Sequence, residues 1–268
     1  MAKTLQPLIS VIMPTYNRLN LIPRSIDSVF GQTHNNIELV IVNDGGESVS
    51  EIIKHFPDTE GRTIKYIELA EHKGVSAARN VALDNATGKY ISLLDDDDIY
   101  LPLALEIRLT ALRKYKVEVV YTRALKDIWD VKDNTYYSVK KELYWDCPFD
   151  KDLLLIQNVA HSPCVLFSRK AWDKSGNYKF DTNLDTGEDY DFWIGLSRNN
   201  VFQDLRIIDA ESSIRMDHSQ STGSKDFSIS YPIIYKKWRD TAINKEEVIK
   251  RQNALLRQIG KNPDDYGL

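Results

Sequence analysis

Leu8-Ile9-Ser10-Val11-Ile12-Met13 is a short apolar run that ends at Pro14, and this pattern predicts a buried strand. The segment that follows carries apolar residues at helical spacing along one face: Ile22, Ile26, Val29 and Phe30. Gly31 comes directly after this predicted helix, at a place where a left-handed cap is expected. The chain therefore begins with a strand that is followed by an amphipathic helix.

The same alternation continues as far as residue 98. Three more apolar strands are predicted, at Ile37–Val42, near Ile64–Leu69 and at Tyr90–Leu94. The turn Asn43-Asp44-Gly45-Gly46 ends the first of these, and a helix from Val75 to about Ala86 stops before Gly88. Such repeats imply right-handed crossovers. They predict an α/β fold with a mainly parallel, twisted sheet of Rossmann-like βαβ units flanked by helices.

Beyond Asp98 the pattern is less regular. Helices are predicted at Pro102–Lys114 and Asp189–Leu196, strands at Val117–Tyr121 and Cys164–Phe167, and a helical tail from about Asp226. Residues 126–150 suit either a loop or a short antiparallel excursion. The second half is therefore expected to extend the sheet of the first half and to end in a C-terminal helical segment.

Polar side chains directly follow three of the predicted strands. Thr15-Tyr16-Asn17 comes after the first strand, Asn43-Asp44 after the second, and Asp95-Asp96-Asp97-Asp98 after Tyr90–Leu94. In open parallel sheets, ligands bind at the carboxyl ends of the strands. The sequence therefore predicts that these three segments meet along one edge and form a ligand site.

The acidic run Asp95–Asp98 permits two interpretations. Two aspartates separated by one residue can share a hard divalent cation with a diphosphate, or divide their contacts between the metal and ribose hydroxyls. A solvated acidic turn that leads into the next helix would also account for the run, because acids are favoured at helix N-termini. The position of the run at the end of a buried strand favours the ligand site.

Length and composition exclude several classes of protein. The 268 residues suffice for one large α/β domain or two small ones that share a sheet, and a charged fraction of 28% is ordinary for a folded enzyme. A net charge of -4 gives no overall positive field, so a nucleic-acid partner is not expected. Cys147 and Cys164 provide neither a disulfide framework nor zinc spacing, and Cys164 is expected in the core.

The N-terminal residues do not form the pattern of a signal peptide, and no apolar stretch is long enough to span a bilayer. A cytoplasmic location is therefore expected, and peripheral contact with the inner membrane face is left open. The aromatic and basic residues of the tail would suit a membrane-surface helix. The acids Asp240, Glu246 and Glu247 instead favour a helix packed on the catalytic domain or on a second subunit, as in a homo-oligomer.

Five motifs occur in a fixed order: Pro14-Thr15-Tyr16-Asn17-Arg18, Val42-Asn43-Asp44-Gly45, Gly74-Val75-Ser76-Ala77-Ala78-Arg79-Asn80, Leu94-Asp95-Asp96-Asp97-Asp98 and Gly187-Glu188-Asp189-Tyr190-Asp191. Together they resemble glycosyltransferase family 2, the inverting group with the GT-A fold, over roughly residues 8–220. The resemblance implies a donor-binding half at residues 1–98 and an acceptor-binding and catalytic half at residues 99–222. Residues 223–268 would then form the C-terminal helical tail.

The resemblance also implies which residues bind the nucleotide-sugar donor: Pro14, Thr15, Tyr16, Asn17, Arg18, Asp44, Gly74, Arg79, Asp95 and Asp96. Asp44 corresponds to the residue that reads the base, commonly uracil, and Arg79 to an arginine near the base and diphosphate. Asp97 corresponds to the direct ligand of a Mn²⁺ or Mg²⁺ ion. Asp95 or Asp96 would hold the ribose or the sugar.

Glu188 and Asp189 correspond to the family's acidic pair near the acceptor, with Asp189 as the general base. Inversion in one displacement needs a deprotonated acceptor hydroxyl, and a positioned carboxylate contributes about 10²–10⁴-fold to such a step. Helix capping alone would also place acids here. Arg215-Met216-Asp217-His218 resembles part of the family's late arginine-x-x-histidine element, in which His218 would reach the metal or diphosphate. A structural hydrogen bond is the alternative for His218.

Several histidines and tryptophans outside the five motifs have mainly structural interpretations. His72 and His161 are expected to be loop residues or supports behind the site. Trp145, Trp172 and Trp193 have faces that suit a sugar ring, but Trp172 and Trp193 are expected in the core because of their helical neighbours.

The expected function is transfer of a hexose or N-acetylhexosamine from a UDP-linked donor to an acceptor hydroxyl, in surface polysaccharide or glycoconjugate synthesis. The acceptor would be a carbohydrate, lipid-linked or protein-linked. A sugar-nucleotide nucleotidyltransferase would need a Gly-rich loop after the first strand, and Pro14–Arg18 has no glycine. A non-catalytic nucleotide-sugar binding module would not need Asp189 as a base, and a glycoside hydrolase would have no use for Asp44 and Arg79.

Overall fold

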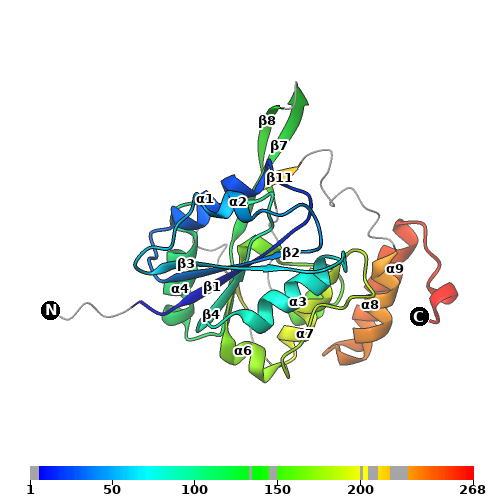
Figure 1. Ribbon diagram of the computed structural model, residues 1–268. Coiled ribbons are helices and arrows are strands. Elements are labelled where there is room, and N and C mark those ends of the chain that lie inside the picture. The colour runs from blue at the N-terminus through cyan, green and yellow to red at the C-terminus, as the bar shows by residue number, and fades with distance from the viewer. Residues whose placement is uncertain (1–5, 133–134, 145–149, 200–201, 205–210, 218–228) are drawn as a thin grey trace.

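The computed structural model describes residues 6–132, 135–144, 150–199, 202–204, 211–217 and 229–268. Its main sheet has seven strands in the order β10-β6-β9-β4-β1-β2-β3 (Figure 1). These strands are β1 (Ile9–Thr15), β2 (Ile37–Asn43), β3 (Arg62–Glu68), β4 (Tyr90–Leu93), β6 (Val119–Tyr121), β9 (Val165–Ser168) and β10 (Phe202–Asp204). Only β9 among them is antiparallel to its neighbours, so the predicted mainly parallel sheet is confirmed.

Strand β1 lies in the interior of the main sheet, between β2 and β4, and is buried along its whole length. It runs through Pro14 to Thr15, so the prediction that Pro14 ends the strand is wrong. The ladder explains why proline is accepted there. The N–H of Leu94, directly after β4, donates to the carbonyl of Ile12. The backbone nitrogen of Pro14, two residues after Ile12, points toward the same neighbouring strand. Because β4 ends at Leu93, opposite Ile12, the missing N–H of Pro14 lies beyond the β4 ladder.

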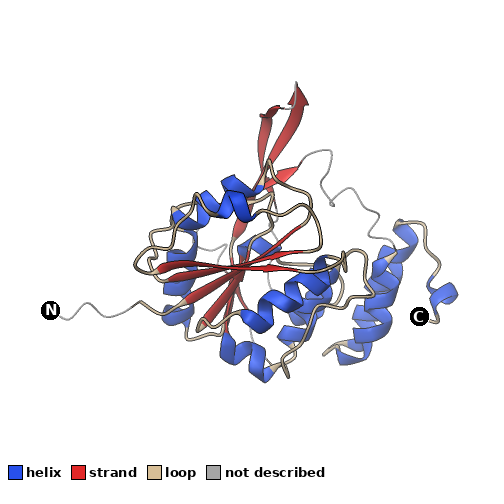
Figure 2. Cartoon of the chain, in the orientation of Figure 1, coloured by secondary structure: helices blue, strands red, loops and turns tan. Residues whose placement is uncertain are grey.

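Helices cover both faces of the main sheet, as Figure 2 shows. Helices α1 (Ile22–Phe30), α2 (Ser50–Ile53) and α4 (Ala104–Tyr115) pack on one face. The other face carries α3 (Val75–Asn85), α5 (Lys151–Leu154), α6 (Arg169–Lys174) and α7 (Glu188–Ser197). Trp172, Trp193 and Cys164 are buried, as predicted. The two apolar layers hold the sheet from both sides and leave its strand ends for the site.

The end of α1 differs from the prediction. Gly31 has a φ of -82°, so it does not form the left-handed cap that its position suggested. The N–H of Gly31 instead donates to the carbonyl of Asp27. The side chain of Gln32 donates from Nε2 to the carbonyls of Ser28 and Leu101. A side-chain donor therefore satisfies the last turn, and no left-handed residue is needed.

A second sheet of four strands, in the order β5-β11-β7-β8, extends from the main body. Its strands are β5 (Ile99–Tyr100), β7 (Arg123–Lys132), β8 (Thr135–Tyr144) and β11 (Glu211–Asp217). β7 and β8 form an antiparallel hairpin that projects from the molecule (Figure 1). Of the two alternatives for residues 126–150, a loop or an antiparallel excursion, the described residues show the excursion, as far as residue 144.

Two C-terminal helices, α8 (Ser230–Trp238) and α9 (Lys245–Gln258), pack on the α7 side of the molecule (Figure 1). Ile234, Tyr235 and Trp238 of α8 enter the same apolar core as α7. Short 3₁₀ turns complete the described elements: η1 (Ser162–Cys164), η4 (Arg239–Thr241) and η5 (Pro263–Tyr266). Of the two arrangements expected for the tail, the described residues show packing on the domain that contains α7.

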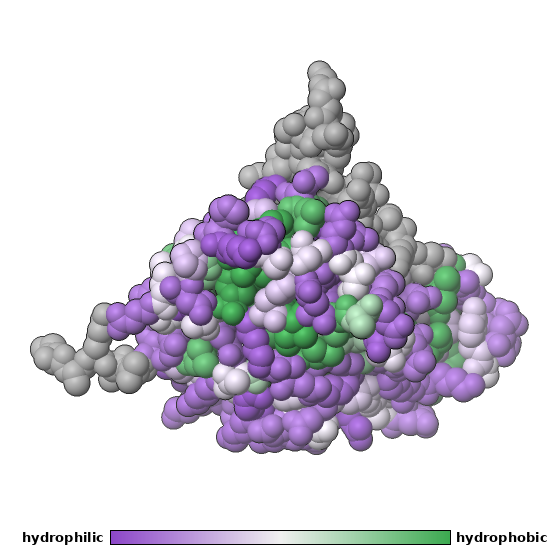
Figure 3. Space-filling model, viewed as in Figure 1, coloured by the Kyte–Doolittle hydropathy of each residue, from purple (hydrophilic) through white to green (hydrophobic). Residues whose placement is uncertain are grey.

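The described helices are each too short or too polar to cross a bilayer. On the face seen in Figure 3, hydrophilic residues predominate along the lower rim, and apolar residues gather in patches nearer the centre.

Candidate active site

The segments that follow β1, β2 and β4 meet at one edge of the main sheet. The N–H of Asp44, after β2, donates to the carbonyl of Thr15 at the end of β1, with a separation of 2.9 Å. Arg18, after β1, forms a 2.8 Å ion pair from Nη1 to Oδ2 of Asp97, after β4. The prediction that these three segments share one edge is confirmed.

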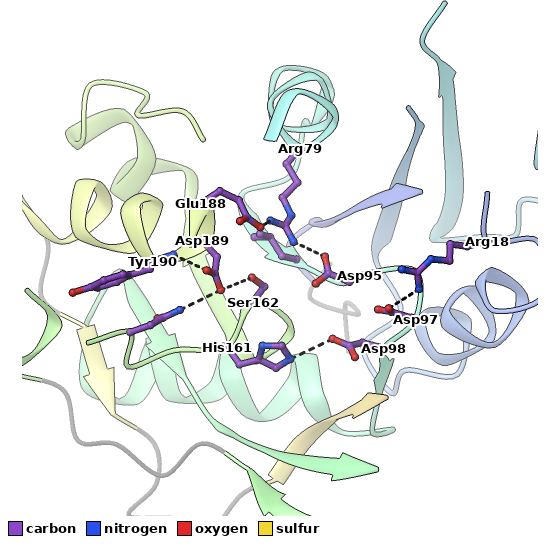
Figure 4. Close-up of polar contacts among 12 residues, drawn as sticks. Arg18, Arg79, Asp95, Asp97, Asp98, His161, Ser162, Glu188, Asp189 and Tyr190 are labelled. Carbon is purple, nitrogen blue, oxygen red and sulfur yellow. Dashed lines mark hydrogen bonds and ion pairs between the residues drawn. The ribbon is translucent and has the colours of Figure 1, made fainter. Parts of the chain in front are cut away.

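Three of the four carboxylates of Asp95–Asp98 have different basic partners, as Figure 4 shows for Asp95, Asp97 and Asp98. Asp95 pairs with Arg79 at 2.7 Å, and Asp97 pairs with Arg18. Asp98 is buried, and its Oδ2 lies 3.3 Å from Nε2 of His161. Asp96 is also buried, and its Oδ2 finds no hydrogen-bond partner among the described residues. Burial at this depth is not what a solvated acidic turn would show.

The loop that carries the acidic run is held by α1. The hydroxyl of Ser25 lies 2.8 Å from the carbonyl oxygen of Asp96 and 2.7 Å from that of Asp98. Burial raises the pKa of Asp96, and the negative charge of Asp97 raises it further. Burial also raises the pKa of Asp98, while the neighbouring His161 opposes this effect. The loop thus concentrates negative charge that a cation would relieve.

Arg79 links the acidic run to the first turn of α7. It lies on α3, is almost completely buried, and pairs through Nη2 with Asp95 and through Nη1 with Glu188, both at 2.7 Å. Burial lowers the pKa of Arg79, but the charges of Asp95 and Glu188 outweigh burial and hold the pKa above its ordinary value. Burial raises the pKa of Glu188, and Arg79 counteracts only part of that rise. Two segments far apart in sequence are thereby joined at the site.

Asp189 lies in the first turn of α7, two residues after Gly187, whose φ of 72° suits glycine. Its Oδ1 accepts the N–H of Tyr190 at 2.7 Å. Its Oδ2 lies 3.2 Å from Nδ2 of Asn158 and 3.4 Å from Oγ of Ser162. In the view of Figure 4, Asp189 and Asp95 lie on opposite sides of the group of labelled residues, with Arg79 above them and His161 below. Neutral donors therefore hold the carboxylate that the sequence predicted as the base.

Asn158 and Ser162 were not predicted as site residues. They belong to the segment before β9, which has neither an acidic run nor a glycine turn to mark it in the sequence. The same segment carries His161, which was expected to be a loop residue or a support. One stretch of five residues thus contacts both Asp98 and Asp189.

The side chain of Asp44 anchors the loop that precedes α3. Its Oδ1 accepts the N–H of Lys73 and its Oδ2 the N–H of Gly74, both at 2.8 Å. Gly74 has a φ of 90°, which the start of α3 requires at this point. The ring of His72 stacks on Tyr16 with 4.1 Å between centroids, and its Nδ1 lies 2.8 Å from Oδ2 of Asp44. His72 therefore contacts both Tyr16 and Asp44, two residues that were predicted to bind the nucleotide.

The described residues offer no group of three or more metal-ligating side chains that could hold an ion unaided. Carboxylate oxygens are nevertheless the ligands that Mg²⁺ and Mn²⁺ prefer, and one or two of them suffice when substrate phosphates and water complete the shell. The unpartnered, buried oxygen of Asp96 and the concentrated charge of the loop fit such a cation. His218, Trp145 and Cys147 lie outside the described residues.

This chain resembles known proteins in sequence and in fold. A sequence model of the family described as Glycosyl transferase family 2 matches residues 10–176. An uncharacterised glycosyltransferase of Rickettsia prowazekii is 33% identical over 75% of this chain and 63% of its own length. One of Methanocaldococcus jannaschii is 31% identical over 75% of this chain and 68% of its own. This chain thus spans less than two thirds of the rickettsial relative.

A glycosyltransferase of Escherichia coli whose name provisionally assigns it to colanic acid biosynthesis is 29% identical, over 87% of this chain and 82% of its own. Among solved structures, S. aureus TarS 1-349 in complex with UDP-GlcNAc has a TM-score of 0.70, with 17% identity, 92% of this chain covered and 71% of that chain. The mannosyltransferase PcManGT from Pyrobaculum calidifontis, in complex with GDP-Man and Mn²⁺, has a TM-score of 0.58, with 18% identity and coverages of 97% and 67%. These likenesses confirm the predicted GT-A fold.

Proposed function

The chain belongs to glycosyltransferase family 2 and is a glycosyltransferase, and we propose that it transfers a hexose or N-acetylhexosamine from a UDP-linked donor to an acceptor hydroxyl with inversion. The observation that carries this proposal is the bridge from Asp95 through Arg79 to Glu188, the neighbour of Asp189. It joins the acidic run, which suits a donor diphosphate and its cation, to a carboxylate that suits a base.

The donor would bind to the half formed by residues 1–98. The loop Pro14–Arg18 would wrap the base and ribose, and Asp44 would read the base. Each oxygen of Asp44 already accepts a backbone N–H, but a carboxylate oxygen has a second lone pair that a base N–H can use. Gly74 begins the helix beside Asp44, and Arg79 holds Asp95 where a ribose or sugar hydroxyl would meet it. TarS in complex with UDP-GlcNAc supports uridine as the nucleoside, and PcManGT with GDP-Man makes guanosine the first competitor to test.

Charge supports a divalent cation at this site. Seven carboxylates gather there, namely Asp44, Asp95, Asp96, Asp97, Asp98, Glu188 and Asp189. The guanidinium groups of Arg18 and Arg79 offset only part of this charge, and a donor diphosphate would add more. Asp97 would hold Mn²⁺ or Mg²⁺, with Asp96 beside it and His218 as a further ligand. Such an ion, when bound, stabilises the negative charge of a departing diphosphate.

Asp189 would remove the proton from the acceptor hydroxyl. The hydroxyl oxygen then forms a bond to the anomeric carbon, the bond from that carbon to the diphosphate breaks on the opposite face, and nucleoside diphosphate leaves. Asn158 and Ser162 would keep Oδ2 of Asp189 directed at the hydroxyl. Glu188 is engaged with Arg79, so its catalytic contribution would be to hold Arg79 and the start of α7 in place.

The acceptor would bind to the half formed by residues 99–222, with residues 223–268 as the packed tail. The acceptor hydroxyl would belong to a carbohydrate, lipid-linked or protein-linked acceptor. The name of the Escherichia coli relative supports a role in surface polysaccharide synthesis. Transfer to such acceptors would suit a cytoplasmic enzyme that contacts the inner membrane face. Ile229 and Ile233 in the tail region are exposed, and they would be available for membrane contact or for pairing of two copies.

Donor hydrolysis tests the proposal most directly. The protein is incubated with UDP-, GDP- and dTDP-linked sugars, with Mn²⁺, with Mg²⁺ and with EDTA, and free nucleoside diphosphate is measured. We expect metal-dependent release from a UDP-sugar. Absence of both binding and release for every donor would contradict the proposal. Pyrophosphate formed from a nucleoside triphosphate and a sugar 1-phosphate would indicate a nucleotidyltransferase, and binding without turnover would indicate a binding module.

A further inference from the structure

His72 lies on the two residues that the proposed function assigns to the nucleobase. Its imidazole stacks on the ring of Tyr16, with 4.1 Å between centroids and 27° between planes. Its Nδ1 lies 2.8 Å from Oδ2 of Asp44 and 3.3 Å from the carbonyl oxygen of the same residue. Both of these oxygens are acceptors, so Nδ1 carries the proton and donates to Asp44.

These are the contacts that a uracil ring would make at the same place. A planar base would stack on Tyr16 and would donate a ring N–H to the carboxylate of Asp44. The imidazole of His72 supplies both a flat ring and a ring N–H. A base that stacks on Tyr16 and donates to Asp44 therefore competes with His72 for both contacts.

Resting on the proposed function, we propose that His72 occupies the place of the nucleobase in the free protein, and that the base of the donor displaces its ring from Tyr16 and Asp44. His72 is thus a residue that sets the affinity of the site for the nucleoside.

The surroundings of His72 allow its ring to move without the loop. The side chain is about half exposed, with 53% of its surface accessible. The loop itself is held by the N–H groups of Lys73 and Gly74, which donate to Asp44 independently of the imidazole. The ring of Tyr16 lies close to Gly46, since a Cβ added to this glycine would be only 3.0 Å from Cδ2 of Tyr16. The imidazole of His72 can therefore turn away while Tyr16 and the loop that Asp44 anchors keep their positions.

Removal of the imidazole should therefore strengthen nucleotide binding. The base would no longer have to break a ring stack and a hydrogen bond. Because His72 is half exposed, we take both interactions at the lower end of their usual range, which corresponds to about a three- to tenfold change in Kd. His72→Ala should lower the Kd for UDP by that factor. His72→Asn, which keeps an N–H near Asp44 but loses the ring, should lower it less.

Calorimetry with UDP in the presence of Mg²⁺ measures these constants on the full chain. His55→Ala is the matched control, because His55 is exposed after α2 and its Nδ1 contacts only the carbonyl of Glu51 among the hydrogen bonds described. Inorganic pyrophosphate with Mg²⁺ is the second ligand, because it has the diphosphate but no base. Its Kd should be the same for the wild type and His72→Ala. Ring NMR signals of His72, assigned by their loss in His72→Ala, should shift with UDP and not with pyrophosphate.

Each other result has a definite meaning. Weaker or unchanged UDP binding by His72→Ala would overturn displacement, since His72 would then form a second wall of the base site or lie away from the base. Equal strengthening for UDP and pyrophosphate would also overturn it, because the effect would not depend on the base. Failure of the wild type to bind any nucleotide would instead contradict the proposed function.

Discussion

Arg79 and Glu188 form a 2.7 Å ion pair although 109 residues separate them in the chain. Arg79 lies on α3, and Glu188 is the first residue of α7. The other arm of the same guanidinium holds Asp95, after β4. One buried side chain therefore sets the distance between the acidic run and the turn that carries Asp189.

A double-mutant cycle should measure this link. Arg79→Ala leaves two carboxylates without their cation and should lower the free energy of unfolding by about 3–5 kcal/mol. Glu188→Ala should cost less, because Arg79 keeps Asp95. The coupling energy between the two changes is expected at about 1–3 kcal/mol, measured by urea unfolding of both single variants and the double variant. A coupling energy near zero would show that the ion pair does not join these segments in solution.

Asp189→Asn should separate donor binding from transfer. The amide keeps the shape of the side chain but cannot accept a proton, so kcat should fall by about 10²–10⁴-fold while the Kd for nucleotide stays within about twofold. Initial rates of transfer and calorimetry with UDP measure the two quantities. Asp185→Asn, an exposed neighbour on the same loop, is the control and should retain normal rates. Transfer at the normal rate by Asp189→Asn would remove Asp189 from the role of base.

Asp97→Ala should weaken donor binding only when metal is present. Loss of the carboxylate removes the proposed ligand of Mn²⁺, and it also leaves Arg18 without this ion pair. We expect the Kd for UDP with Mn²⁺ to rise at least about tenfold, to the value measured with EDTA. Mn²⁺ binding in the presence of UDP, followed by electron paramagnetic resonance, gives an independent readout. Asp173→Ala, at an exposed position on α6, is the control. A metal effect that survives in Asp97→Ala would place the cation elsewhere.

Lys237→Met should loosen the tail from α7. Asp191 of α7 is fully buried and accepts from Lys237 at 2.9 Å, from Nε1 of Trp238 at 2.6 Å and from the hydroxyl of Tyr178 at 2.8 Å. Without the lysine this carboxylate keeps only neutral donors, which should cost about 2 kcal/mol of stability. Urea unfolding and limited proteolysis of the tail measure the effect. The neighbouring, exposed Lys236→Met should leave both unchanged, and equal behaviour of the two variants would deny Lys237 this role.

Glu38→Gln should destabilise the protein in a pH-dependent way. Burial by itself would raise the pKa of Glu38, but donors from Ser10, Thr87 and Gly88 outweigh burial and hold the pKa below its ordinary value of 4.5. The contribution of the carboxylate to stability is therefore fully present above about pH 4.5 and is lost as the pH falls through the lowered pKa. The free energy of unfolding of the variant at pH 7 should be about 2 kcal/mol lower than that of the wild type.

The difference between Glu38→Gln and the wild type should shrink at pH values below 4.5, where protonation removes the advantage of the wild type. Chemical unfolding at pH 7, 5 and 3 measures this trend. Glu60→Gln, at an exposed position, should show no such difference at any pH. A gap that stays constant down to pH 3 would mean that the charge of Glu38 does not matter.

Much of the structure of residues 6–98 could be predicted because its signals are local. Apolar runs such as Ile37–Val42 and the turn at Asn43-Asp44 lie within a few residues of each other, and the edge of a parallel sheet brings such strand ends together. The same local reasoning failed at Pro14 and Gly31. Whether proline ends a strand depends on where the neighbouring strand stops, and whether a helix needs a left-handed cap depends on a donor such as Gln32.

The acidic run could be located from the sequence alone, because its four carboxylates directly follow a buried strand and so lie at the ligand-binding edge of a parallel sheet. The partners of these carboxylates could not be predicted from the sequence. Which of the four meets Arg79, Arg18 or His161 depends on segments that lie far apart along the chain and are brought together only by packing. Asn158 and Ser162 are absent from any sequence motif for the same reason.

The sequence by itself thus determined the main alternation of strands and helices up to residue 98, the family motifs and the edge at which they converge, since apolar periodicity and turn chemistry act between near neighbours. Only the tertiary structure decided that Arg79 joins Asp95 to Glu188 and that His72 covers Tyr16. Those contacts depend on distances across the fold, and a side chain such as His72 carries no local sign of the ring on which it will lie.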